Sequence, residues 1–169
     1  MIEAAPIIVT ALFGAEDQAW FDRQRKAFFP PERNYLAAHL TLFHHLAPGL
    51  LPELKQRLSA LTRGVPPPRA RIAGLMNLGR GVAYRIESDA LEDIRDSLKH
   101  AFASMLTPQD SAGWRPHVTV QNKVAPKDAR ALLGRLEREF APRTVPIAGL
   151  ATFYYRGGPW EAISRHKFA

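Results

Sequence analysis

The stretches His39-Leu40-Thr41-Leu42 and His117-Val118-Thr119-Val120 decide the fold, because they repeat one pattern of histidine, apolar residue, threonine and apolar residue 78 positions apart. A match at one offset is informative only if other positions obey it too. The same offset relates further pairs, most of them apolar: Leu46 and Val124, Ala47 and Ala125, Pro48 and Pro126, Leu54 and Leu132, Arg57 and Arg135, and Leu58 and Leu136. One register for all these pairs indicates an internal duplication.

Two more segments extend the duplication at slightly different offsets. The run Ile72–Leu75 recurs as Ile147–Leu150 at an offset of 75, and each run precedes an Arg-Gly pair within a hairpin pattern. Upstream, Arg25–Phe28 corresponds to Lys99–Phe102 at an offset of 74. Changes of offset between segments fit a duplication, because connecting segments tolerate insertions.

Hydrophobic patterns predict the same order of elements in each half. Strands are expected over residues 7–13, 39–46, 70–78, 82–86, 117–120, 147–155 and 160–164. Helices are expected from about residue 16 up to Pro30 and over 51–61, 90–105 and 127–140, with a stiff connector at 64–68 and a polar loop at 108–113. We therefore expect a single bilobal α+β domain over residues 1–169, with lobe-forming repeats of strand, helix, strand, helix and strand at about 6–78 and 82–164.

Composition limits the chemistry available to this domain. The chain has 169 residues, 46% of them hydrophobic, which is enough for a real core. The absence of cysteine excludes a disulfide scaffold, thiolate zinc ligands and cysteine nucleophiles. A net charge of +7 favours an anionic partner, although a basic surface also serves solubility. No apolar stretch approaches the ~18 residues of a membrane span, so we expect no membrane association and a cytoplasmic location.

Both motifs place histidine and threonine on the same side of a strand. Alternate strand residues share a face, so His39 lies beside Thr41 and His117 beside Thr119. If the two strands flank a pseudo-two-fold axis, two imidazoles and two hydroxyls converge. Imidazoles form an acid–base pair near neutral pH, and hydroxyls donate to phosphate oxygens. The pattern therefore predicts a site for a phosphodiester.

Other chemistries have weaker support in the sequence. His39, His44, His45 and His117 offer imidazoles to a metal, but no Asp or Glu lies in or next to either motif. A serine nucleophile elbow and a glycine-rich phosphate loop are both missing from the sequence. We therefore expect neither a metal nor a cofactor.

Alternation also extends each motif toward secondary site residues. Phe43 and His45 continue the polar face of the first motif, as Gln121 and Lys123 continue that of the second, while His44 faces the other way in a structural role. Lys123 and Arg115 are candidates for a phosphate clamp. The candidates for a surface on which a base stacks are all aromatic: Phe43, Tyr154, Tyr155 and Trp160.

The paired His-x-Thr-x motifs, about 80 residues apart in a duplicated αβ chain, resemble the two-histidine (2H) phosphoesterase superfamily. The resemblance covers essentially the whole chain and is strongest to the bacterial 2'-5' RNA ligase or RNA 2',3'-cyclic phosphodiesterase family. It implies a bilobal fold with antiparallel sheets around a central cleft and no metal. It also implies that 2',3'-cyclic phosphate ends are opened to 2'-phosphates, with some members also joining RNA ends through 2'-5' linkages.

Carried over by position, the resemblance makes His39 and His117 the acid–base pair and gives phosphate binding to Thr41 and Thr119. It favours His117 as the group that activates water and His39 as the group that protonates the leaving oxygen. Many relatives place an arginine shortly after the second motif, where this chain has Gln121-Asn122-Lys123.

The expected function is therefore a metal-independent phosphodiesterase acting as a monomer on RNA ends or cyclic nucleotides. Two alternatives stay open at this point. One is a non-catalytic protein that binds RNA or nucleotides, and the other is a cyclic phosphodiesterase for a non-RNA nucleotide.

Overall fold

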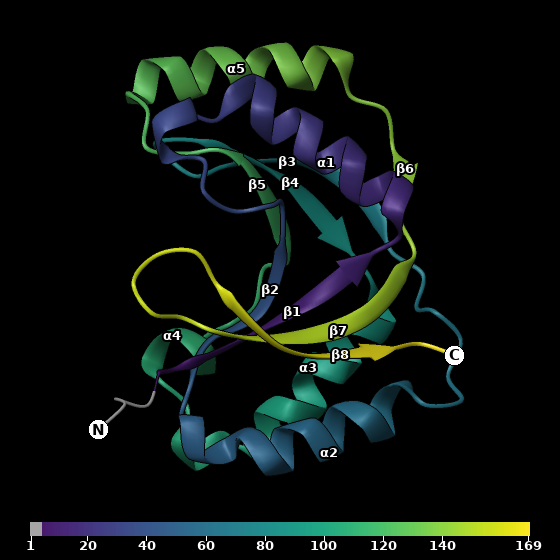
Figure 1. Ribbon diagram of the computed structural model, residues 1–169. Coiled ribbons are helices and arrows are strands. Elements are labelled where there is room, and N and C mark those ends of the chain that lie inside the picture. Colours follow the sequence, from purple (N-terminus) through teal and green to yellow (C-terminus); the bar gives the residue numbers. More distant parts are fainter. Residues whose placement is uncertain (1–4) are drawn as a thin grey trace.

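The computed structural model describes residues 5–169, which form two four-stranded antiparallel sheets with helices on their outer faces (Figure 1). The first sheet has the order β2-β1-β7-β8, and the second has the order β5-β4-β3-β6. The strands of the first sheet are β1 (Ile7–Phe13), β2 (Leu40–Leu46), β7 (Ile147–Tyr154) and β8 (Glu161–Lys167). Those of the second are β3 (Arg71–Asn77), β4 (Val82–Glu87), β5 (His117–Gln121) and β6 (Arg143–Thr144). The predicted α+β class with antiparallel sheets is confirmed.

Four long helices cover the outer faces of the sheets in two pairs. Helices α1 (Ala15–Phe28) and α5 (Pro126–Glu139) lie over the second sheet, and α2 (Leu51–Thr62) and α3 (Asp89–Ala101) lie against the first (Figure 1). A single helical turn, α4 (Pro108–Ser111), precedes β5. Among residues 5–169, no helix is both long enough and apolar enough to cross a membrane.

The two repeats exchange elements, so the lobes do not follow the repeats. Strand β3 comes from the first repeat but pairs with β4 of the second, and β7 from the second repeat pairs with β1 of the first. The helices cross over as well, because α1 packs on β5 while α3 reaches β2. The prediction that each repeat forms its own lobe is therefore wrong: each sheet is built from strands of both repeats.

Two local predictions differ from the structure, and one short strand was not predicted. The helix expected over 90–105 ends at Ala101 and continues only as a short 3-10 turn. The polar loop expected at 108–113 contains α4, which begins where the Thr107 hydroxyl accepts the amide hydrogen of Asp110 over 3.3 Å. The short strand β6 had no signal of its own, because its two residues pair only with the edge of β3.

Burial explains the alternation of the two motif strands. Leu40, Leu42, Val118 and Val120 are all 0% exposed, and burying each such side chain contributes roughly 1.5–3 kcal/mol. Because these residues face the core, the histidines and threonines between them face the other way.

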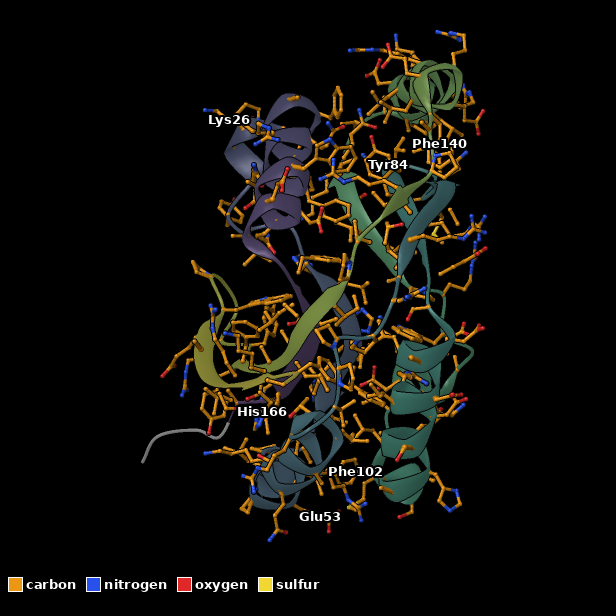
Figure 2. The ribbon with its side chains drawn as sticks, turned by 90° about the vertical axis from the view of Figure 1, so that its right-hand side faces the viewer. Lys26, Glu53, Tyr84, Phe102, Phe140 and His166 are labelled. Carbon is orange, nitrogen blue, oxygen red and sulfur yellow. The ribbon has the colours of Figure 1, made fainter. Side chains whose placement is uncertain are left out.

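Each pair of helices packs on the sheets through aromatic side chains. Tyr84 lies beneath α1, with its ring centroid 5.2 Å from that of Trp20, and Phe102 lies between α2 and α3 (Figure 2). These contacts fix the helices against the sheets that carry the motifs.

Candidate active site

The two motifs meet at one cleft of about 420 Å³ between the sheets. His39 and Thr41 come from β2 and the residue before it, and His117 and Thr119 come from β5. We call this space the catalytic cleft, and its remaining lining is mixed in character: His44, Arg95, Gln109, Ala112, Gly113, Trp114, Arg115 and Trp160. All four motif residues predicted to converge are thus brought together.

Both histidines are held by the same local contact. The Nδ1 atom of His39 lies 2.9 Å from the carbonyl oxygen of Ala37, and Nδ1 of His117 lies 2.7 Å from that of Arg115. Because a carbonyl oxygen only accepts, each Nδ1 must carry the hydrogen and donate it. Each ring therefore keeps Nε2 for the cleft, where it accepts a proton as a base or delivers one as an acid.

The environment of His39 favours the neutral imidazole. Burial, the largest cause, together with the charge of Arg25 and the neighbouring His117, lowers its pKa from 6.5 to about 4, although the hydrogen bond to Ala37 acts in the opposite direction. The ring of Trp160 packs against the imidazole with a centroid distance of 4.5 Å. At neutral pH His39 is therefore uncharged, with a free lone pair on Nε2.

Two buried arginines support the motif strands from behind. Arg25 of α1 donates from Nη1 to the Thr119 carbonyl oxygen over 3.4 Å, and Arg95 of α3 donates from Nε to the Leu42 carbonyl oxygen over 3.2 Å. Both side chains are at most 4% exposed, and burial lowers the pKa of each. Each repeat thus sends a cation to the motif strand of the other repeat, and Arg95 also lines the catalytic cleft.

A β-bulge in β2 changes which residues face the cleft after Thr41. Thr10 pairs with Thr41, but the next residue of β1, Val9, pairs with Phe43, so Leu42 is the extra residue. The bulge turns Phe43 into the core, where it is 0% exposed beneath Arg95. It turns His44 into the cleft, and a second register shift, between Val9 and Ile7, leaves His45 exposed outside the lining. The predictions that Phe43 and His45 line the cleft, and that His44 faces away, are wrong for this reason.

The bulge also brings His44 to a buried carboxylate that the sequence patterns do not predict. Asp110 of α4 is 0% exposed and accepts the amide hydrogens of His44 and His45 over 2.8 and 2.9 Å. Its Oδ1 lies 3.4 Å from Nδ1 of His44. Burial alone raises the pKa of Asp110, but the hydrogen bonds from His44 and His45 outweigh it and hold that pKa below its usual value. The only signal in the sequence was Thr107 three residues before Asp110, which is typical of a helix start.

A second bulge affects the residues after Thr119. Ala83 of β4 pairs with Thr119 while Val82 pairs with Gln121, so Val120 is extra. Gln121 is only 7% exposed and its Oε1 atom has no hydrogen-bond partner among residues 5–169. Lys123 is exposed in a turn with φ of 64° beyond the end of the strand. Neither residue lines the catalytic cleft, contrary to the prediction.

The remaining predicted residues divide into two groups. Arg115 and Trp160 line the cleft as expected. Tyr154 instead packs under Arg156, whose guanidinium carbon lies 5.0 Å from the ring centroid, and Tyr155 is 46% exposed. Neither tyrosine belongs to the cleft lining.

A larger cavity of about 780 Å³ adjoins the catalytic cleft, and the two share His39 and Trp160. We call it the apolar cavity, because its lining is mostly hydrophobic: Ala11, Leu12, Phe13, Ala15, Leu36, Ala37, Ala38, Ala148, Phe153 and Pro159, with Thr10, Gln18, Tyr35, Arg165 and Lys167 as the other members. Trp160 lines both spaces, and its ring lies 5.6 Å from that of Phe153, which lines the apolar cavity. A ligand larger than a phosphate therefore has room on one side of His39.

Within the described residues 5–169, no three His, Asp or Glu side chains are grouped as a metal site. The ionisable groups that line the cleft are the three histidines with Arg95 and Arg115, and Asp110 lies behind His44.

Sequence comparison places this arrangement in a family. Residues 13–159 match the profile of the 2'-5' RNA ligase superfamily, which covers most of the chain and both motifs. The chain belongs to the 2'-5' RNA ligase superfamily. This membership confirms the resemblance drawn from the paired motifs and makes the protein one of a group of 2'-5' RNA ligase-like enzymes. A comparison with curated protein sequences gave no match.

Several solved structures share the fold along their full length. A structure of TT0787 from Thermus thermophilus has a TM-score of 0.69 at 17% identity and covers 96% of this chain and 97% of its own. LigT from E. coli in complex with NADP+ has a TM-score of 0.65 at 17% identity, covering 98% and 99%. LigT in complex with 3'-AMP has a TM-score of 0.63 at 17% identity, covering 99% of both chains. At this identity the likeness establishes the fold.

Proposed function

We propose that the protein is a metal-independent phosphodiesterase that opens the 2',3'-cyclic phosphate of RNA ends or nucleotides to a 2'-phosphate. The observation that carries the proposal is the matched anchoring of two imidazoles at one cleft, each with Nδ1 bound to a carbonyl and Nε2 left for chemistry. Two such groups with two hydroxyls are sufficient for acid–base hydrolysis of a phosphodiester.

In the proposed reaction His39 is the base. Its neutral Nε2 removes a proton from water, and the oxygen attacks the phosphorus of the cyclic phosphate. The bond from phosphorus to the 3' oxygen breaks, and His117 gives that oxygen its Nε2 proton. The products are the 2'-phosphate and a free 3' hydroxyl, and the two histidines exchange protons with solvent to start again. The lowered pKa of His39 supports this assignment, which is the reverse of the one expected from the resemblance.

Thr41 and Thr119 bind the phosphate in this scheme. Their hydroxyls lie on the same strand faces as the histidines and donate to the non-bridging oxygens. Arg95 and Arg115, also in the lining, supply positive charge for the transition state. With a 5' hydroxyl of a second RNA end in place of water, the same attack on phosphorus and the same loss of the 3' oxygen join the two ends through a 2'-5' linkage.

The test is product analysis on a panel of 2',3'-cyclic phosphates, comprising mononucleosides, an RNA oligonucleotide end and a cyclic phosphate of an ADP-ribose derivative. Phosphorus NMR distinguishes a 2'-phosphate from a 3'-phosphate. We expect the 2'-phosphate only, with equal rates in the presence and absence of EDTA. Binding without turnover of any substrate would contradict the proposal and favour the non-catalytic alternative. Loss of turnover with EDTA would show that a metal is required.

A further inference from the structure

The apolar cavity contains two cations that the proposed reaction does not use. Arg165 and Lys167 of β8 both line it, and none of its other lining residues is acidic. Within residues 5–169, neither cation forms an ion pair or a side-chain hydrogen bond, whereas Arg156 near the start of the same hairpin strand pairs with Glu161 over 2.6 Å. Two exposed cations that face a cavity without a partner mark a place for an anion.

Sheet register places these cations on the same face as the catalytic residues. Thr41 pairs with Thr10, Thr10 pairs with Ala151, and Ala151 pairs with Arg165. Directly paired residues of antiparallel strands point to the same side of the sheet. Thr41 and Arg165 are therefore the two ends of one row of paired residues that crosses the sheet. Lys167 is two residues after Arg165 and therefore shares its face, as His39 shares that of Thr41.

The intervening residue of β8 confirms this alternation. His166 lies on the opposite side of the first sheet, toward α2, where its Nδ1 is 3.1 Å from Oγ of Ser59 (Figure 2). The alternation of side chains along β8 therefore places Arg165 and Lys167 on the cavity side of the sheet.

The row of paired residues also gives the distance between Thr41 and Arg165. Three strand spacings of about 4.8 Å separate β2 from β8, so the backbones of Thr41 and Arg165 lie roughly 14 Å apart along the sheet. Because the side chains of Arg165 and Lys167 are long, an anion that they bind lies closer to an anion at Thr41 than the two backbones lie to each other. Of the two residues between them, Thr10 lines the cavity and Ala151 is fully buried, and Trp160 and Phe153 add two aromatic rings to the lining. The apolar cavity of about 780 Å³, which shares His39 with the catalytic cleft and is lined by Arg165 and Lys167, has room for a nucleoside.

We propose that Arg165 and Lys167 form a second anion site, which selects substrates whose nucleoside carries a further phosphate beside the 2',3'-cyclic one. That phosphate is the 5'-phosphate of a mononucleotide or the internucleotide phosphate of an RNA end, since both present the same anion. The inference rests on the proposed function for the position of the cyclic phosphate.

The experiment compares three substrates with the wild-type protein: adenosine 2',3'-cyclic phosphate, its 5'-phosphorylated form, and the dinucleotide ApA ending in a 2',3'-cyclic phosphate. We expect kcat/KM to be about 10-fold higher for the two substrates with a second phosphate, through a lower KM, as one or two charge-assisted hydrogen bonds provide. In the double variant Arg165→Gln and Lys167→Gln, the ratio of kcat/KM values should fall to about one. The matched control, Arg156→Gln, removes a cation of the same hairpin outside the cavity and should keep the ratio.

Binding measurements separate this inference from the proposed function. Calorimetry with adenosine 2',5'-bisphosphate and with 2'-AMP needs no turnover, and the bisphosphate should bind about 10-fold more tightly to the wild type and equally to the double variant. A wild type without preference in either assay, or a double variant that keeps the preference, would overturn the inference. If only one of the two second-phosphate substrates is preferred, the source of the phosphate is identified. Absence of hydrolysis with preserved bisphosphate selectivity would overturn the proposed function alone.

Discussion

The two His-x-Thr strands hold their histidines in the same way but surround them differently. On β2 and β5 alike, Nδ1 donates to the carbonyl two residues earlier, and a buried arginine from the other repeat binds the strand behind the threonine. On β2 the histidine packs against Trp160 and its pKa is lowered to about 4. The duplication thus kept the same anchoring at both histidines, while different surroundings lower the pKa of His39, which in the proposed scheme makes it the base.

The two strands also differ after their bulges. Beyond the bulge of β2, His44 faces the cleft with Asp110 behind it. Beyond the bulge of β5, Gln121 is buried with an unpaired Oε1 within residues 5–169. The first arrangement adds an ionisable ring to the cleft, and the second adds only a cost to stability. The predictions below change one strand at a time.

The largest effect is expected from removal of either catalytic imidazole. His39→Ala and His117→Ala should each lower kcat on a 2',3'-cyclic nucleotide by about 10²–10⁴-fold, because each removes one proton transfer. The double variant should be little worse than either single variant, since the two groups act as a unit. His100→Ala on the exposed side of α3 is the control. Full activity in either single variant would contradict the scheme.

Much of this comparison could be predicted from the sequence alone. The duplication, the long elements and the convergence of the four motif residues follow from register and alternation. Alternation failed after Thr41 and Thr119, where each strand contains a bulge. A bulge adds one residue on one strand only. The extra residues here, Leu42 and Val120, are apolar, as the regular alternation also predicts, so the hydrophobic pattern does not reveal the bulges.

The exchange of strands between repeats and the role of Asp110 were also beyond the sequence. Repeats that are equivalent in sequence are compatible with either contiguous or exchanged pairing, because both bury the same apolar faces. Asp110 lies in a polar stretch, and only tertiary contact with β2 makes it a buried carboxylate.

A second prediction concerns the carboxylate behind β2. Asp110→Ala should lower the free energy of unfolding by about 3 kcal/mol, because it leaves the amide hydrogens of His44 and His45 without their acceptor and removes a carboxylate that stabilises the charge of the buried Arg95. Urea denaturation followed by circular dichroism measures the change. A loss below the error of the fit would show that Asp110 does not hold β2 in place.

A third prediction tests the imidazole that the β2 bulge turns inward. His44→Gln should raise KM for the cyclic phosphate about 3–10-fold with little change in kcat, because it removes the imidazole that lines the cleft beside the motif residues and can hydrogen-bond to the phosphate. The matched control is His45→Gln, which changes the adjacent, exposed ring. Equal effects of the two variants on KM would show that the bulge has no role in binding.

The smallest effect is expected on the other strand. Gln121→Leu removes the buried Oε1, which has no partner within residues 5–169, and should raise the free energy of unfolding by about 1 kcal/mol without changing KM. Urea denaturation and steady-state kinetics test both parts. Destabilisation would mean that the amide of Gln121 makes a contact that stabilises β5.

The division of roles between the two strands is tested most directly by the pH dependence of kcat/KM for a 2',3'-cyclic nucleotide. A base must be unprotonated, so activity rises with pH through the pKa of His39, which burial lowers to about 4. We therefore predict that kcat/KM rises with pH on the acidic side with a midpoint near pH 4. By pH 6 the protonation of His39 should no longer limit it. An acidic limb centred near pH 6.5, the ordinary value for an imidazole, would contradict the assignment of His39 as the base.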